Sequence, residues 1–215
     1  MVVSDGLAPT SVREPGRVLK DHIADSLVAL ELPEPAAAKS VVDIGSGAGF
    51  PGLVLAIARP ESEVVLLEAS ARKCGFIERA AARCEVGNAR PVHARAEAWP
   101  EGIGRFDLAT ARALAPLSAV LEYAAPLLRL GGAVIAWRGR RDREAEAVGE
   151  RAAAALGLRL DGVRRVVPYS DAAHRHLHVA TKVVETPAAF PRRPGAARKR
   201  PLGALDSGSS DRSRR

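Results

Sequence analysis

The residues best placed to do chemistry are a group of glycines and an acid that follows them. The run VVDI, from Val41, leads directly into the glycines of GSGAGFPG, which end at Gly52. A strand that ends in glycines lets the backbone approach a ligand closely, and its free N–H groups can bind acceptor oxygens. Glu68 ends a second apolar run, VVLLE, where an acid can accept hydrogen bonds from ribose hydroxyls. The pattern predicts a nucleotide-cofactor site.

The glycine spacing alone leaves the cofactor open. Gly45, Gly47 and Gly49 form G-x-G-x-G, typical of S-adenosyl-L-methionine sites, but Gly47, Gly49 and Gly52 also form the G-x-G-x-x-G of NAD sites. Asp43, at the end of the first run, favours adenosylmethionine, because a carboxylate suits a cationic amino-acid cofactor better than a pyrophosphate. The alternative is that Asp43 only accepts hydrogen bonds from the loop N–H groups.

The elements that must position these residues alternate along the chain. An amphipathic helix is predicted from Pro15 to Leu32, with an apolar face of Leu19, Ile23, Leu27 and Leu30. Further helices are expected at 71–84, at 116–129 with Gly131-Gly132 as its stop, and at 141–156; strands are expected at 41–44, 64–68, 91–93, 106–112 and 133–137.

Two more strands, at 158–169 and 176–185, have only a short turn region between them and predict an antiparallel hairpin. The pattern as a whole predicts an α/β fold with a doubly wound, mostly parallel, seven-stranded sheet. Its last strand should be antiparallel and lie at the edge.

Composition excludes several classes of protein. No apolar run approaches the roughly 20 residues needed to span a bilayer, and the start has no secretory pattern, so we expect a cytoplasmic protein without membrane contact. Cys74 and Cys84 are spaced for neither a metal knuckle nor a redox pair. His174, His176 and His178 could share a strand face, but no acid or cysteine completes a metal site. We therefore expect no metal.

The positive charge is concentrated at the C-terminus. Residues 191–215 hold eight of the basic residues and two aspartates, which accounts for most of the net charge of +7. This segment is also rich in Pro, Gly and Ser, so it is predicted to be largely disordered alone and to attract phosphate.

Several motifs in fixed order resemble one known family, the bacterial 16S ribosomal RNA guanine-N7 methyltransferases called RsmG or glucose-inhibited division protein B. The resemblance runs from about Thr10 to Gly203. The motifs that carry it are SVREP, DHIADSL, DIGSGAGFPG, LLEASARKCGFI, HARAEAW, ATARALAPL and FPRRPGAARKRPLG.

The resemblance implies a Rossmann-like class I methyltransferase that uses S-adenosyl-L-methionine to methylate N7 of a guanine in the decoding-region loop of 16S rRNA. The family's cofactor contacts correspond to Gly45, Phe50, Ala96, Glu97 and Arg112. All follow predicted strands on one rim of the sheet, where open α/β sheets bind ligands. Family members usually begin with additional helices ahead of Thr10, which makes the N-terminal segment here short by comparison.

Guanine N7 has a free lone pair, so no general base is expected. Arg112 is the candidate for the base side of the pocket, followed by Arg138 and Gly139. Candidate contacts to RNA are Arg138 and the tail cations Arg192, Arg193, Arg198, Lys199 and Arg200.

We therefore expect a helical segment at 1–32, a methyltransferase domain at 33–190 and a basic tail at 191–215. The expected partner is 16S rRNA or a small-subunit assembly intermediate, and the expected state is a monomer. Two other functions stay open. One is an NAD-dependent oxidoreductase, which would need a Tyr and Lys pair that neither Tyr123 nor Tyr169 has nearby; the other is a non-catalytic RNA-binding protein on a degenerate methyltransferase fold.

Overall fold

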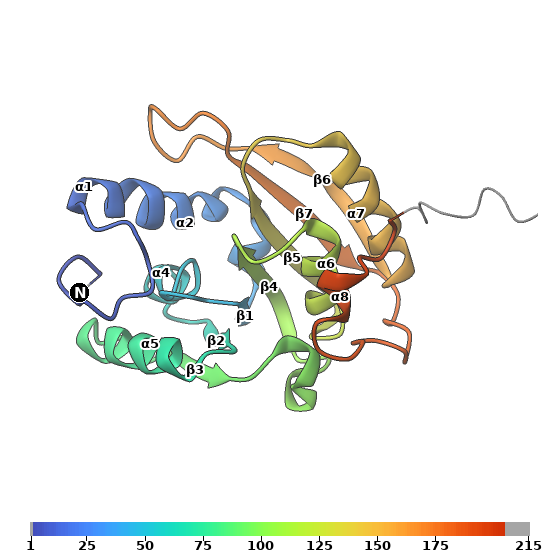
Figure 1. Ribbon diagram of the computed structural model, residues 1–215, viewed down its shortest axis with the longest axis horizontal. Coiled ribbons are helices and arrows are strands. Elements are labelled where there is room, and N and C mark those ends of the chain that lie inside the picture. Colours follow the sequence, from blue (N-terminus) through green and yellow to red (C-terminus); the bar gives the residue numbers. More distant parts are fainter. Residues whose placement is uncertain (1, 205–215) are drawn as a thin grey trace, which may run out of the picture.

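The apolar, β-branched runs of the sequence form the centre of a seven-stranded sheet with the order β3-β2-β1-β4-β5-β7-β6 (Figure 1). The structure is a computed structural model and describes residues 2–204. The strands are β1 (Ser40–Ile44), β2 (Glu63–Glu68), β3 (Ala89–His93), β4 (Phe106–Arg112), β5 (Leu128–Arg138), β6 (Leu158–Arg165) and β7 (His176–Lys182). The α/β class and the seven strands are as predicted.

Strands β1 to β5 are parallel, and β7 is antiparallel to both of its neighbours, β5 and β6. The predicted hairpin of β6 and β7 is confirmed. The predicted edge position of the last strand is wrong, because β7 inserts between β5 and β6. The carboxyl ends of β1 to β5 meet at one rim, which is where such sheets bind ligands.

Helices cover both faces of the sheet. Successive residues of a strand point to opposite faces, so Val64 and Leu66 pack on one side while Val65 and Leu67 pack on the other. The first side is covered by α3 (Pro33–Ala37), α4 (Gly52–Ala58), α5 (Ala71–Arg83) and the N-terminal helix; the second is covered by α6 (Leu117–Ala124), α7 (Arg143–Ala155) and α8 (Ala196–Lys199). None of the helices within residues 2–204 has the length and apolarity to cross a membrane.

The N-terminal helix forms as predicted but presents a different face. It runs through α1 (Pro15–Val18), a π-helical stretch (Leu19–Ala24), α2 (Asp25–Leu27) and a 3-10 turn (Val28–Glu31). Leu19, predicted to be buried, is 62% exposed, and Leu27 and Leu30 are also exposed, whereas Asp25 and Ser26 are buried. The wider π-helical winding shifts the residues that follow out of the α-helical phase on which the prediction depended.

The two glycines Gly131 and Gly132 do not stop a helix. Helix α6 already ends at Ala124, and both glycines lie inside β5, which begins at Leu128. Gly131 has a φ of +79°, and a Cβ on Gly132 would come within 2.8 Å of the carbonyl oxygen of Phe106. They permit the irregular pairing of β5 with the start of β4.

The C-terminal segment is more ordered than predicted up to the last described residue. Residues 191–204 pass over α6, with Ala196 and Ala197 buried and Arg192 paired with the buried Glu122. Residues 191–215 are rich in Pro, Gly and Ser, which predicted disorder. The burial of Ala196 and Ala197 and the ion pair of Arg192 with Glu122 stabilise residues 191–204 against the body of the protein. The remainder of the predicted disordered tail, residues 205–215, lies outside the described residues.

Candidate active site

The glycine loop after β1 is held by hydrogen bonds from its backbone N–H groups to the end of β2. Gly45 N–H donates to the carbonyl of Leu67 at 2.7 Å, and Gly47 N–H donates to Glu68 Oε2 at 3.0 Å. Gly45, Gly47 and Gly49 have φ values of +70°, +59° and +91°, which disfavour other residues. A Cβ on Gly45 would also lie 2.5 Å from Leu114 Cδ1. The loop therefore depends on glycine both for its dihedral angles and for its contact with the end of β4.

Asp43 supports this loop from below and does not face a cavity. It is fully buried; Oδ2 accepts the N–H of Gly52 at 3.1 Å, and Oδ1 accepts the hydroxyl of Thr110 at 2.9 Å. Burial raises the pKa of this carboxyl. The expectation that Asp43 contacts the cofactor does not fit this geometry, because the side chain is fully buried and lines neither of the two cavities described below. The alternative interpretation, that Asp43 accepts hydrogen bonds from loop N–H groups, agrees with its contact to Gly52.

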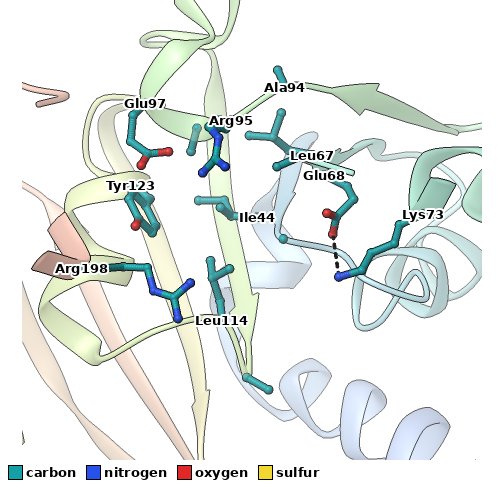
Figure 2. Close-up of a pocket in the computed structure, with 14 residues that line it drawn as sticks. Ile44, Leu67, Glu68, Lys73, Ala94, Arg95, Glu97, Leu114, Tyr123 and Arg198 are labelled. Atoms are coloured by element: carbon teal, nitrogen blue, oxygen red, sulfur yellow. Dashed lines mark ion pairs between the residues drawn. The ribbon is translucent and has the colours of Figure 1, made fainter. Parts of the chain in front are cut away.

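A cavity of about 310 Å³ opens at the ends of β1, β2 and β3 (Figure 2). It brings together four of the predicted cofactor residues, namely Gly45, Glu68, Ala96 and Glu97. The wall also contains charged and aromatic side chains that were not predicted at the cofactor, namely Lys73, Arg95, Tyr123 and Arg198. Lys73 lies on the same side of the cavity as Glu68, with its Nζ 3.9 Å from Glu68 Oε2. We call this space the first cavity.

The donors and acceptors of the first cavity fit an adenosyl cofactor. Glu68 is buried, and each of its oxygens accepts one backbone N–H, from Gly47 and from Ser70, both at 3.0 Å. A carboxylate oxygen has two lone pairs, so each can still accept a hydroxyl of a ribose. Glu97 and Tyr123 stand on the opposite wall from Glu68 (Figure 2). The carboxylate that fixes the loop is thus also available to the ligand.

A second cavity of about 400 Å³ lies beside the first, at the ends of β4 and β5. Arg112 and Arg138, the two predicted substrate-side residues, both line it, together with Gly139. Arg138 donates to the carbonyl of Ala115 at 2.7 Å. Asp21, His22 and Asp25 also line it, so the N-terminal helix contributes three residues to the wall of this cavity.

Arg112 is fixed by that helix. Its guanidinium donates to Asp25 Oδ2 at 3.0 Å and to the carbonyl of Asp21 at 2.9 Å, and it lies 3.1 Å from His22 Nδ1. Phe50 completes the cluster: its ring stacks on His22 with centroids 4.6 Å apart, and Arg112 lies over it at 5.6 Å. Phe50 and Arg112, expected at the cofactor, therefore lie in this cluster and do not line the first cavity.

The cluster is short of one hydrogen bond. Asp25 is 5% exposed, and among the described residues its Oδ1 has no hydrogen-bond partner. Arg175 Nε lies 3.2 Å from this oxygen, which makes an ion pair, but its N–H does not point at it. Burial lowers the pKa of His22, and Arg112 acts in the same direction, so this imidazole is neutral at pH 7. The only signal for Asp25 in the sequence was its place in DHIADSL.

The remaining predicted cations are divided among three settings. Arg192 is held by Glu122 through two hydrogen bonds of 2.7 and 2.5 Å, and Arg198 enters the first cavity. Arg193, Lys199 and Arg200 are exposed. Arg198 is exposed as well, so four of the five lie at the surface, where phosphate could reach them, and three of these four do not line the first cavity.

Comparison with known proteins bears on what these two cavities serve. The family model described as rRNA small subunit methyltransferase G matches residues 6–177. The chain belongs to this family. The ribosomal RNA small subunit methyltransferase G of Desulfitobacterium hafniense is 37% identical over 90% of this chain and 81% of its own, and that of Syntrophomonas wolfei is 42% identical over 86% of each.

Solved structures agree with this small subunit methyltransferase G assignment at the level of the fold. A SAM-dependent methyltransferase from Aquifex aeolicus aligns with a TM-score of 0.60 at 14% identity, covering 79% of this chain and 94% of its own. The antibiotic-resistance methyltransferase Kmr aligns with a TM-score of 0.56 at 20% identity, covering 73% and 93%. The Rossmann-like methyltransferase fold is confirmed.

As a member of the methyltransferase G family, the chain is a methyltransferase, and adenosylmethionine is its cofactor. The NAD-dependent alternative is therefore wrong: the G-x-G-x-x-G spacing occurs here in a methyltransferase loop. Across residues 2–204, no three His, Cys, Asp or Glu side chains are grouped to hold a metal ion.

Proposed function

We propose that this chain methylates N7 of a guanine in the decoding-region loop of 16S rRNA, with adenosylmethionine in the first cavity and the guanine in the second. Membership of the small subunit methyltransferase G family supports the class of RNA. The base, the atom and the loop are inferred from the family resemblance and from the chemistry of the second cavity.

The observation that carries the proposal is the junction of the two cavities at Ala113. This residue lines both, directly after Arg112 at the end of β4. Its φ is +53°, a conformation that costs a non-glycine residue about 1 kcal/mol or more and that concentrates at functional sites. A methyl donor in one cavity and an acceptor in the other would meet at this point.

The chemistry needs orientation more than proton transfer. When bound, adenosylmethionine supplies an activated methyl group on a positively charged sulfur. Guanine N7 carries its lone pair at neutral pH, so no residue has to remove a proton before attack. The residues of the second cavity would hold the base in line with the methyl group, an effect that can supply several kcal/mol of the barrier.

The polar groups of the second cavity suit guanine. Asp21 and Asp25 line this cavity, and a carboxylate there can accept hydrogen bonds from the N–H donors on the Watson–Crick edge. Arg112 and Arg138 can donate to O6, as arginine does in other guanine sites. His22, whose ring is stacked on Phe50, adds an aromatic side chain to the wall. Unpaired bases in RNA are commonly read by this combination of edge hydrogen bonds and stacking.

Mass spectrometry of the product tests the proposal. The purified chain is incubated with isotopically labelled adenosylmethionine and with either naked 16S rRNA or small subunits lacking the modification, and the RNA is digested to nucleosides. We expect labelled 7-methylguanosine, and mapping should place it in the decoding-region loop. The matched control is a transcript in which guanosine is replaced by 7-deazaguanosine, which has no N7 lone pair and should stay unlabelled.

Three outcomes separate the alternatives. Label on another base, or on the 7-deaza transcript, would overturn the N7 assignment. Cofactor binding without transfer to either substrate would instead favour a non-catalytic RNA-binding protein. Transfer to only one of the two substrates would identify naked rRNA or the assembled particle as the partner. A cytoplasmic location and a monomeric state belong to the same proposal, and gel filtration tests the latter.

A further inference from the structure

The C-terminal segment at 191–204, which we call the strap, is fastened to the cofactor side of the molecule. Arg192 pairs with Glu122 of α6, and Gly195 N–H donates to Glu97 Oε1 at 3.0 Å. Ala196 and Ala197 of α8 are buried against α6. Glu97, a wall residue of the first cavity, is thereby one of the anchors of the strap.

This attachment brings Arg198 into the first cavity. Figure 2 shows its guanidinium extending from α8 past Tyr123 to the side of Leu114. Among the described residues, Arg198 makes neither a hydrogen bond nor an ion pair, so its five N–H donors are available. The other basic wall residues are differently placed: Lys73 is near Glu68, and Arg95 lies at the end that holds Glu97.

The cofactor has one anionic group, the carboxylate of its methionine moiety. Glu68 faces the cavity from the end of β2, where ribose hydroxyls are bound in such folds. We place the ribose at Glu68 and the adenine toward Ala96 and Glu97, because the Glu97 carboxylate would repel the methionine carboxylate; the amino-acid moiety then extends toward Gly45 and Leu114. That is the end where Arg198 enters.

We propose that Arg198 binds the methionine carboxylate of adenosylmethionine, and that the strap is therefore a part of the cofactor site. Guanidinium and carboxylate match in a planar, two-bond geometry that a lysine does not reproduce. The inference rests on the adenosylmethionine site of the proposed function and not on the identity of the target nucleotide. It gives the basic segment two roles, because all three of Arg198, Lys199 and Arg200 are exposed but only Arg198 lines the first cavity.

Calorimetry with two ligands that differ in this carboxylate tests the assignment. S-adenosylhomocysteine keeps the amino acid, whereas 5′-methylthioadenosine lacks it. We expect Arg198→Ala to weaken S-adenosylhomocysteine about 10-fold or more and to leave 5′-methylthioadenosine within about 2-fold. Arg198→Lys should recover only part of the loss, and Lys199→Ala should bind both ligands like the unmodified chain.

Arg95→Ala is the matched comparison from the same wall, and we expect it to show no preference for the ligand with the carboxylate. Equal losses for both ligands in Arg198→Ala, or none, would overturn the proposal, as would a larger selective loss in Arg95→Ala. Thermal unfolding of each variant checks that it is folded. Neither titration involves RNA, so a wrong target nucleotide would overturn the proposed function and leave this assignment intact.

Discussion

Glu68 is the side chain that connects the loop to the cofactor cavity. Its oxygens accept the N–H groups of Gly47 and Ser70 and still face the cavity. Replacing it with alanine removes hydrogen bonds to a charged acceptor, each contributing about 1.5–3 kcal/mol. We expect Glu68→Ala to weaken S-adenosylhomocysteine about 10-fold to 100-fold in calorimetry. Glu63→Ala, at the exposed start of the same strand, is the control and should bind normally; unchanged affinity in Glu68→Ala would contradict its role.

Asp43 should matter for stability more than for ligand binding. Asp43→Ala leaves the N–H of Gly52 and the hydroxyl of Thr110 without their acceptor in a buried site, at about 1–3 kcal/mol each. We expect a matching fall in the free energy of unfolding in urea. Asp43→Asn keeps one acceptor and should lose less. If Asp43→Asn lost cofactor affinity while keeping its stability, the carboxylate would have to contact the cofactor after all.

Among the elements, the strap depends on one buried carboxylate. Glu122 is 1% exposed and its charge is balanced by Arg192. Arg192→Ala would leave that charge unpaired, so we expect a loss of about 3 kcal/mol in urea unfolding. The double variant Arg192→Met with Glu122→Leu removes both charges and should recover most of it. Equal stability of the single variant and the unmodified chain would show that the pair does not hold the strap.

Helix α7 and strand β7 are joined by a titratable contact. His178 is buried 3.4 Å from Glu146. Arg141 holds the pKa of Glu146 down, to about 2, and burial lowers the pKa of His178 below its ordinary value. Both groups bind protons more weakly when folded, so the stability they contribute is present above their unfolded pKa values and is lost as the pH falls. For His178 the loss begins below about pH 6.5.

We therefore expect the Tm of His178→Gln to fall less than that of the unmodified chain when the pH is lowered from about 7.5 to about 5.5. The exposed His93→Gln is the control and should keep the full pH dependence. Identical Tm curves for His178→Gln and the unmodified chain would mean that His178 protonation does not limit stability in acid.

The elements also show what a sequence can reveal. The runs VVDI, VVLLE and FDLATAR were predictable as strands because most of their residues are apolar, as expected of strands buried on both faces. The N-terminal helix was predictable, but its buried face was not, since π-helical winding and the inward Asp25 depend on contacts with Arg112. The role of Gly131 and Gly132 could not be decided from the local sequence, because glycine is favoured both at the end of a helix and at an irregular position in a strand.

At the scale of the whole molecule, local sequence patterns predict few of the contacts between distant residues. That Gly45, Glu68, Ala96 and Glu97 meet in one cavity was predictable, because parallel strands end at one rim. That Arg198 joins them was not, since it lies about a hundred residues from Glu97 and reaches it through the strap. Their charge led to the prediction that Arg192 and Arg198 bind RNA. In the structure, Arg192 is paired with Glu122 and Arg198 lines the first cavity.

The exposed cations that remain on the strap lead to a prediction about RNA. Arg193, Lys199 and Arg200 are exposed, and Arg193 and Arg200 border one shallow cavity. Contacts to phosphate release counterions, so each contributes about 0.7–0.9 to the slope of log affinity against log salt. Changing all three to glutamate should weaken binding to a 16S rRNA fragment, measured by fluorescence anisotropy, and reduce the slope by about 2. Arg83→Glu with Arg90→Glu, on exposed sites near α5 and β3, is the charge control. If both sets of variants changed the slope equally, the attraction would belong to the net charge of the chain and not to the strap.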